Sequence, residues 1–498
     1  MRGPIALKGA LRTLSRGQDR PSSQPIMGGH YPPPTEHKRS SMTRTLFCAR
    51  LSLGLAAAAV LTGTALAEPS VFPTGTTRYD PAKAYASFVV FASPDAKTHL
   101  IDMDGHEVHR WDLGGFPSEL LDPAVTGGAK GHVLVQVAAG ADSGTGEVPG
   151  AAIFDNKTIG ELDWDGKLVW SWGDKAPGGS ARQHHDWKRL ANGDTLVLAN
   201  LPHAIEGFAQ KRVLDDAIYE VTPRGDVVWR WVASEHLDEL GFTPEQLKLV
   251  KASPSPDYLH INDMKPVGPN HWYAAGDQRF APDNIIIDSR NANVIVIIDK
   301  KTGHVVWRLG PNFDRLPTQA SAAPRPVDQL SGQHDAQIIP EGLPGAGNLL
   351  VFDNQGEAGY PPVALGVTSG SRVLEIDPVS KTIVWSYSAE TSNAAGWTFH
   401  SPFISDARRL PNGNTFVDEG INGRFFQVTR AGEIVWEYVS PFFSQTTVGG
   451  GVNQLVKSNW VYRATPAPYD WAPAGTPHAE VAVTPPPVED FRVGGPAN

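Results

Sequence analysis

The feature that most constrains the fold is a short hairpin motif that ends in tryptophan and recurs along the chain. Each copy has an apolar strand, usually with an acidic residue, then a turn, then a β-branched strand closed by the tryptophan. This order is typical of two antiparallel strands joined by a tight turn. The six copies end at Trp111, Trp170, Trp229, Trp307, Trp385 and Trp436.

The spacing of these tryptophans indicates how many strands each repeat contains. The intervals are 59, 59, 78, 78 and 51 residues, which suit four-stranded sheets with loop insertions rather than solenoid turns. We therefore predict an all-β fold, a six-bladed β-propeller of four-stranded antiparallel blades, over residues 68–465. The tryptophans are expected to fill space between neighbouring sheets. The segment 451–464 is expected to complete the first blade and cover the exposed edges of the ring.

The two ends of the chain differ in composition from the repeats. Residues 42–67 have basic residues, an Ala/Leu-rich core and a small-x-small motif, which predicts a cleaved signal peptide and a periplasmic or secreted protein with no membrane association after cleavage. An uncleaved anchor is the alternative. Residues 1–41 are expected to be a disordered extension, either a long n-region or the result of a start codon placed too early. Residues 466–498 read as a Pro/Ala-rich C-terminal tail.

Composition excludes two classes of function. The net charge is −10 and the isoelectric point is about 5.9, and no Lys/Arg block occurs in the repeats, so nucleic acid is not an expected partner. Cys48 is the only cysteine and lies in the signal segment. The mature chain therefore has no thiol for catalysis, a disulfide or a thiolate metal site.

A second repeated phrase carries the candidate chemistry. It alternates polar and apolar residues, turns at an Asn or Gly, and in three of four copies begins with histidine. We interpret His185, His260 and His334, 75 and 74 residues apart, as equivalent positions of successive blades. If the phrase forms the innermost strand, the three imidazoles converge on one pocket at the mouth of the central channel.

Other polar residues near these phrases fit an anion site. Arg290 interrupts a β-run, where its guanidinium can present a planar fork of donors to an oxyanion. Together with Asn262 and the three histidines it has the composition expected for a tetrahedral anionic ester, with neutral imidazole as nucleophile or general acid. His400 or Ser401, at the start of the last phrase, can complete the ring as a substrate-binding group.

The sequences RQHHDWKRLANGDTLVLAN, LHINDMKPVG, DNIIIDSRNANVIVIIDKKTGHVVWRLG and GQHDAQ resemble the arylsulfate sulfotransferases that do not use a nucleotide sulfate. The resemblance implies transfer of a sulfuryl group from a phenolic sulfate ester to a phenolic acceptor, by a ping-pong route through a sulfohistidine, with no cofactor. It makes His334 the nucleophile. His260, Asn262, Arg290 and His185 would bind the sulfuryl oxygens, and one of the histidines would protonate the leaving phenolate.

Two other functions and a metal site are alternatives to the sulfotransferase interpretation. Trp-rich propeller repeats also occur in pyrroloquinoline quinone dehydrogenases, and a propeller of this kind can be a noncatalytic ligand-binding protein. Three histidines can also hold zinc with an open fourth position, but the arginine beside them and the resemblance favour a site without metal. Residues 233–259 predict one or two short helices, capped at Thr243, which either cover the channel mouth or decorate the surface.

Overall fold

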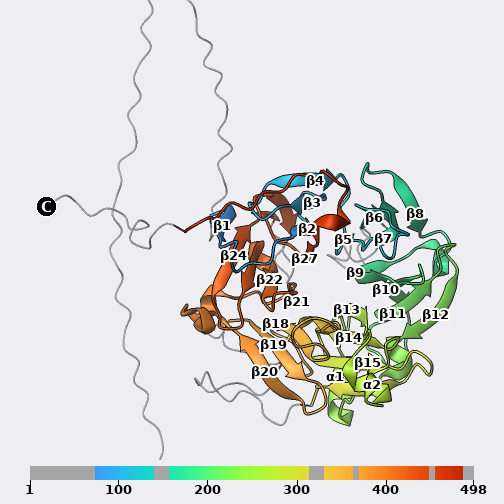
Figure 1. The fold of residues 1–498 in the computed structure, drawn as a ribbon. Coiled ribbons are helices and arrows are strands. Elements are labelled where there is room, and N and C mark those ends of the chain that lie inside the picture. Colours follow the sequence, from blue (N-terminus) through green and yellow to red (C-terminus); the bar gives the residue numbers. More distant parts are fainter. Residues whose placement is uncertain (1–72, 140–155, 313–329, 363–369, 448–454, 486–498) are drawn as a thin grey trace, which may run out of the picture. The chain divides into compact units, whose positions relative to one another are not determined.

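The computed structural model describes residues 73–139, 156–312, 330–362, 370–447 and 455–485, all within one compact unit, 67–498. These residues form mostly antiparallel strands, and their sheets stand side by side around a common axis in a propeller-like arrangement (Figure 1). The predicted all-β class is confirmed. The predicted extension 1–41 and signal peptide 42–67 lie outside the described residues. Among the helices of the described ranges, none is long and apolar enough to span a bilayer.

Three sheets have four strands in the order expected of a propeller blade, and a fourth has five. The first is β27 (Ala464–Ala467), β2 (Phe88–Ala92), β3 (Thr98–Ile101) and β4 (Glu107–Trp111). The second is β13 (Ile261–Pro266), β14 (Ile285–Ser289), β15 (Val294–Ile298) and β16 (Val305–Leu309). The third is β17 (His334–Ile338), β18 (Leu349–Asp353), β19 (Arg372–Asp377) and β20 (Thr382–Tyr387). The five-stranded sheet is β21 (Asp406–Arg409), β22 (Thr415–Glu419), β23 (Arg424–Val428), β24 (Ile434–Val439) and β1 (Gly75–Tyr79).

The remaining strands form one eight-stranded sheet and a small hairpin. The larger sheet contains two groups of four strands, joined between β7 and β9 through the pair Asn156 and Gln183. The first group is β5 (Glu119–Leu120), β6 (Val133–Ala139), β7 (Asn156–Leu162) and β8 (Leu168–Trp172). The second is β9 (Gln183–Arg189), β10 (Thr195–His203), β11 (Val213–Val221) and β12 (Val227–Val232). The hairpin is β25 (Ser444–Thr447) and β26 (Leu455–Ser458).

Tryptophans of the hairpin motif tie each group of strands to the next. In every case the indole N–H donates to a backbone carbonyl in a turn of the following group, which adds a directional bond to the apolar packing between sheets. The donor and acceptor pairs are Trp111 and Asp163, Trp172 and Gly225, Trp229 and Lys300, Trp307 and Pro378, Trp385 and Arg430, and Trp436 and Met103. The expected structural role is confirmed, except that Trp172 rather than Trp170 makes the bond in the second copy.

Both ends of the repeat region close the ring. β27 pairs with β2, so a C-terminal strand completes the first sheet, but this strand is Ala464–Ala467 rather than the predicted segment 451–464. β1 pairs with β24 and extends the last sheet on its other edge. The packed region also continues past the predicted boundary at 465, because the main chains of Tyr79 and Val483 exchange two hydrogen bonds. The predicted tail therefore begins too early.

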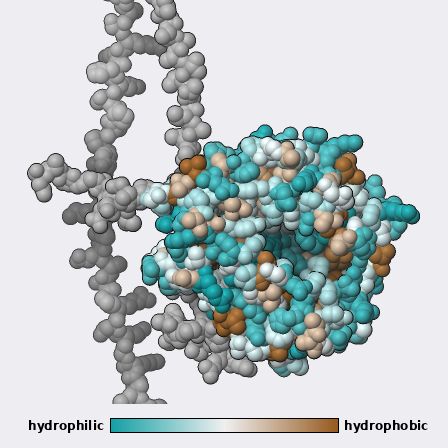
Figure 2. Space-filling view, viewed as in Figure 1, coloured by the Kyte–Doolittle hydropathy of each residue, from teal (hydrophilic) through white to brown (hydrophobic). Residues whose placement is uncertain are grey.

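The histidine phrases form the strands nearest the axis. β13, β17, β21 and β27 each lie at one end of their sheet, and β9 lies at one end of its group of four strands. Successive members of this series contact one another around the axis. The face of the molecule shown in Figure 2 has a hollow near its centre, lined mostly by hydrophilic residues. The predicted helices within 233–259 are also present, as η4 (Ala233–His236) and α1 (Pro244–Lys251), with Thr243 and Gln246 forming a capping box. A second short helix is α2 (His271–Ala274).

Candidate functional site

Three predicted histidines come together where the inner strands begin. The rings of His185 and His260 are 4.4 Å apart at their centroids and nearly perpendicular. His334 is close enough that it and His260 both act on the pKa of His185. His185 and His334 are only 4% and 2% exposed. The predicted convergence of the imidazoles is therefore present in the structure.

The histidines do not, however, occupy equivalent positions in their phrases. The inner strands align on the aspartates Asp186, Asp263, Asp335 and Asp406, and the residue before each is His185, Asn262, His334 and Ser405. His260 lies two residues before Asn262 and precedes β13. It reaches the cluster because its backbone has a positive φ of 53°, as His185 does at 55°. The even sequence spacing of the three histidines hides this difference.

The side chains of the adjacent residues His184 and His185 point in different directions. His184 Nε2 lies 3.2 Å from Asp216 on β11, so this ring turns into its own sheet. His185 instead contacts His260, Phe116 and Tyr462. The two rings remain joined by a 2.8 Å contact between their Nδ1 atoms. His185 is thus the residue of this pair that faces the other histidines.

The tautomer of His334 follows from its neighbours. Its Nδ1 lies 2.9 Å from the Gly332 carbonyl and 2.8 Å from Asn354 Oδ1, so Nδ1 carries the proton and donates. Its Nε2 accepts a 3.1 Å hydrogen bond from the Ile404 N–H. Burial, and then the positive charge of Arg290, lowers the pKa of His334 well below its usual value. His334 is therefore a neutral imidazole whose unprotonated nitrogen is Nε2, with its lone pair engaged by the Ile404 N–H.

Arg290 is placed beside His334 by the turn that ends β14. Its backbone N–H donates to the His260 carbonyl at 3.1 Å, and its guanidinium donates to Asn291 Oδ1 at 3.0 Å. Burial lowers the pKa of Arg290, while the carboxylate of Asp257 opposes that shift. An arginine stays charged under such conditions. The site therefore contains one fixed positive charge close to the neutral His334.

Asp257 is a site residue that the sequence did not single out. Its Oδ2 lies 2.5 Å from His260 Nδ1. Burial acts to raise the pKa of Asp257, but His260, His184 and Arg290 outweigh that effect and lower it. A carboxylate at this position orients the imidazole. The only sequence signal is its position three residues before His260, in the insert 233–259.

Asn262 is fully buried next to the histidines. Its side-chain Nδ2 donates to the Gln333 carbonyl at 3.1 Å, and its own carbonyl accepts from Tyr462 at 2.7 Å. Its Oδ1 is buried without a hydrogen-bond partner among the described residues. The side-chain NH₂ group has two N–H donors, and the contact with Gln333 uses one of them.

His400 and Ser401 lie in the loop before β21. The Ser401 hydroxyl donates to the Phe403 carbonyl at 2.8 Å, and its carbonyl accepts from Asn354 at 2.7 Å. Ser401 thus shapes the loop that carries Ile404. The backbone N–H of His400 donates to Glu419 at 2.9 Å, and burial lowers the pKa of its imidazole. Ser401 is linked to His334 through Asn354, whereas the contact recorded for His400 leads to Glu419.

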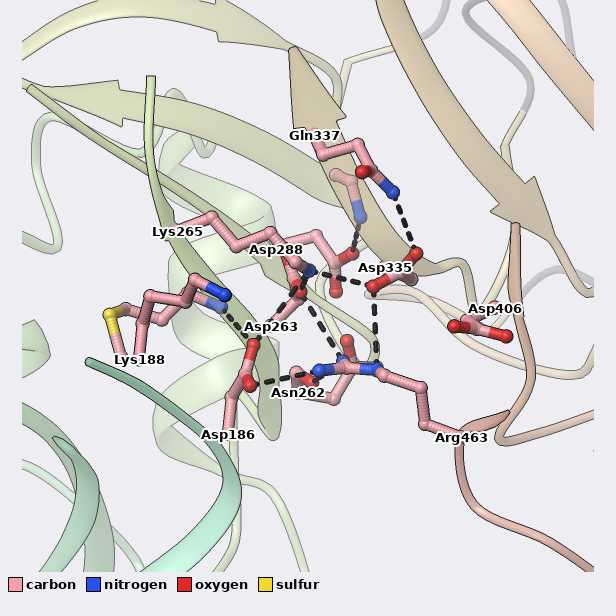
Figure 3. Close-up of polar contacts among 12 residues, drawn as sticks. Asp186, Lys188, Asn262, Asp263, Lys265, Asp288, Asp335, Gln337, Asp406 and Arg463 are labelled. Carbon is pink, nitrogen blue, oxygen red and sulfur yellow. Dashed lines mark hydrogen bonds and ion pairs between the residues drawn. The ribbon is translucent and has the colours of Figure 1, made fainter. Parts of the chain in front are cut away.

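An ionic network joins the aspartates that directly follow His185, Asn262 and His334 in the sequence (Figure 3). The guanidinium of Arg463 is 2.8 Å from Asp186, 3.3 Å from Asp263 and 3.4 Å from Asp335. Lys265 joins the same carboxylates and lies 2.6 Å from Asp335 Oδ1. Burial lowers the pKa of Lys265 to about 8 despite the pull of Asp335. Residues far apart in the sequence are therefore joined at the axis by buried charges.

The carboxylates of this network also fix the inner strands. Asp186 accepts the Met264 N–H of the next strand at 3.1 Å, and Asp335 accepts the Ala407 N–H at 3.4 Å. Each aspartate directly follows a residue of the predicted site. The network therefore holds the backbone immediately beside His185, Asn262 and His334.

An aromatic group borders His185 on the side of the C-terminal segment. Phe116 stacks on Tyr462 with centroids 3.9 Å apart, and its ring meets His185 at 5.1 Å. Trp460 lies 6.2 Å from Phe116. Such rings can contact a planar apolar group next to the charged part of a ligand. The sequence gives little indication of this contact, because Phe116 and Tyr462 come from opposite ends of the chain.

Residues 143–447 match a family model described as Arylsulfotransferase (ASST). No curated protein matched the chain. A protein of unknown function from Bacteroides caccae is 12% identical over 77% of this chain and 99% of its own, with a TM-score of 0.42. A virginiamycin B lyase from Staphylococcus aureus is 15% identical over 63% of this chain and 68% of its own, with a TM-score of 0.31.

Proposed function

The chain belongs to the arylsulfotransferase (ASST) family, and from that premise we propose that it moves a sulfuryl group from a phenolic sulfate ester to a phenolic acceptor. The observation that carries the proposal is the state of His334. This buried imidazole has its proton fixed on Nδ1 by Gly332 and Asn354, and it lies beside the charge of Arg290. That is the arrangement required of a nitrogen nucleophile for an anionic ester.

In the first half-reaction, Nε2 of His334 attacks sulfur. The N–S bond forms, the bond from sulfur to the aryl oxygen breaks, and the aryl oxygen leaves with a proton. In the second half-reaction the acceptor phenol attacks sulfur, gives up its proton, and releases His334. The hydrogen bond from Ile404 to Nε2 must open before attack, since it uses the same lone pair.

We assign the proton transfers to His260. Its contact with Asp257 orients the ring, which would give a proton to the leaving phenolate and recover one from the acceptor. His185 suits this role less well, because burial and then the neighbouring imidazoles and Arg463 lower its pKa well below the usual value. His260 therefore gives one proton to the leaving group in the first half-reaction and takes one from the acceptor in the second.

Arg290, Asn262 and His185 are proposed to bind the sulfuryl oxygens. Charge develops on these oxygens and on the departing aryl oxygen, so fixed donors stabilise the transition state more than the bound ester. Loss of one such donor is expected to lower kcat by roughly 10²- to 10³-fold. The aromatic group of Phe116 and Tyr462 would lie against the aryl ring.

We further propose that the ring has six blades. The tryptophan bonds support this number, because they lead through six groups of strands and return from Trp436 to Met103 beside β3. The eight-stranded sheet then counts as two blades joined at Asn156 and Gln183. The signal-like segment 42–67 supports export, with catalysis in the periplasm or outside the cell.

The direct test is sulfuryl transfer from 4-nitrophenyl sulfate to added phenol by the purified chain. Release of nitrophenol that depends on phenol, with formation of phenyl sulfate, is expected. The variant His334→Gln should release none above background. The variant His106→Gln, changed at an exposed histidine, should retain the activity. Absence of transfer with a range of aryl sulfates would reject the proposal.

A further inference from the structure

A second cluster of histidines lies on the surface, away from the sequence phrases of the catalytic site. His236 ends η4, directly after β12, and Glu239 follows three residues later. His304 stands in the turn between β15 and β16 of the next sheet. The Trp231 indole donates to Gly303 at 3.1 Å, so the two segments are already held together at this point.

The donor atoms of the cluster converge. His236 Nδ1 is 3.1 Å and His304 Nδ1 is 2.8 Å from the same oxygen, Glu239 Oε1. The three ligand atoms all lie within 4.8 Å of one another. A tetrahedral zinc ion with bonds of about 2.0–2.2 Å needs ligand atoms about 3.3–3.5 Å apart. Small side-chain movements would therefore open the hydrogen-bonded cluster to the size of a zinc site.

The surroundings hold these ligands in place. The second oxygen of Glu239 accepts the Val305 N–H at 2.7 Å, which fixes the carboxylate plane. The His236 ring stacks on Trp231 with an interplanar angle of 11° and centroids 5.1 Å apart. Ligand orientation by such outer contacts is a common property of metal sites. His304 is 67% exposed at its side chain, so an ion and a water molecule can reach the cluster from solvent.

We propose that His236, Glu239 and His304 bind a divalent ion of the zinc class. Two imidazole nitrogens and one carboxylate oxygen, with water in the fourth position, match the preferences of Zn²⁺ rather than those of Mg²⁺ or Ca²⁺. The ion would join the base of the insert 233–259 to the neighbouring sheet. This site is separate from the sulfuryl-transfer chemistry and does not depend on it.

The test is calorimetric titration of the full chain, freed of metal by a chelator, with zinc chloride. Saturable binding at one site is expected, and His304→Ala should remove it. His304 is exposed, so its replacement should not disturb folding, which circular dichroism verifies. The matched control is His106→Ala, whose side chain is 71% exposed at another turn and should leave binding unchanged.

The effect of zinc on thermal unfolding distinguishes binding at this site from binding at the catalytic histidines. Zinc should raise the thermal unfolding midpoint of the unchanged chain and of His334→Ala, but not that of His304→Ala, because binding only to the native state stabilises it. Binding that survives in His304→Ala, or that disappears in His334→Ala, overturns the proposal. So does the absence of saturable zinc binding by the unchanged chain.

Discussion

The amide oxygen of Asn354 lies 2.8 Å from Nδ1 of His334. Asn354 directly follows β18, and His334 is the first residue of β17. In the proposed transfer the ring gains positive charge when Nε2 bonds to sulfur, and the Nδ1–H then donates more strongly. Hydrogen bonds to charged groups contribute about 1.5–3 kcal/mol. The proposed mechanism therefore makes Asn354 a positioning residue whose contribution rises during the reaction.

Replacement of Asn354 by alanine should lower kcat by roughly 10- to 100-fold with little change in KM, since the lost bond matters most as charge develops. Steady-state kinetics with 4-nitrophenyl sulfate would measure the split. Ser371→Ala is the matched control, because Ser371 bonds to the same loop without contacting His334. Equal losses in the two variants would mean that Asn354 acts only on the loop.

The Asp257 carboxylate should matter most for poor leaving groups. Asp257→Asn is expected to slow transfer from phenyl sulfate much more than from 4-nitrophenyl sulfate, because the nitrophenolate needs little protonation as it leaves. Measuring kcat/KM over a series of aryl sulfates of increasing phenol pKa gives the comparison. Asp277→Asn, changed at an aspartate that pairs with Arg279, serves as the control. A uniform loss over the series would contradict the role given to His260.

Stability should fall on acidification partly because of His334. Burial and the charge of Arg290 lower its pKa in the folded state, so below a pH of about 6.5 the unfolded chain binds a proton that the native chain does not. Unfolding is then favoured by up to about 1.4 kcal/mol per pH unit. Urea unfolding at neutral and mildly acidic pH should show a smaller acid loss for His334→Gln. An unchanged or larger loss would argue against a buried neutral imidazole.

The Arg463 network should be a major determinant of stability. Arg463→Met removes a cation that pairs with three buried carboxylates, and breaking a buried ion pair in this way costs about 3–5 kcal/mol. Arg230→Met, at an arginine 57% exposed and paired with Glu235, should cost no more than about 1 kcal/mol. Urea unfolding of both variants provides the measurement. Similar losses would show that the network contributes little.

The tryptophan motif predicted much of the fold because its signal is local and repeated. Period, turn and closing residue all lie within a few positions, so the all-β class and the closing role of the C-terminal segment could be inferred from the sequence. Register was harder to infer. Trp172 replaces Trp170 in the bond to the next group of strands, and His260 lies two residues before the position that His185 and His334 occupy in their strands, although the sequence spacing of the three histidines is nearly even.

Site residues that act through other residues left no comparable signal. Asn354 orients His334 from a neighbouring strand, 20 positions later, and its identity alone does not distinguish it from a turn residue. Phe116 and Tyr462 meet only because the ring closes. Asp257 lies in the insert 233–259, where the helical pattern drew attention instead. Contacts of this kind depend on the tertiary fold, so periodicity and motif spacing do not reveal them.

The most direct test of the central claim is the mass of the chain after brief mixing with 4-nitrophenyl sulfate and no acceptor, followed by peptide mapping under mildly alkaline conditions. We predict one added sulfuryl group on the peptide that contains His334, and its loss when phenol is added. Nitrophenol release without any adduct on that peptide, or an adduct at another residue, would contradict the assignment of His334 as the nucleophile.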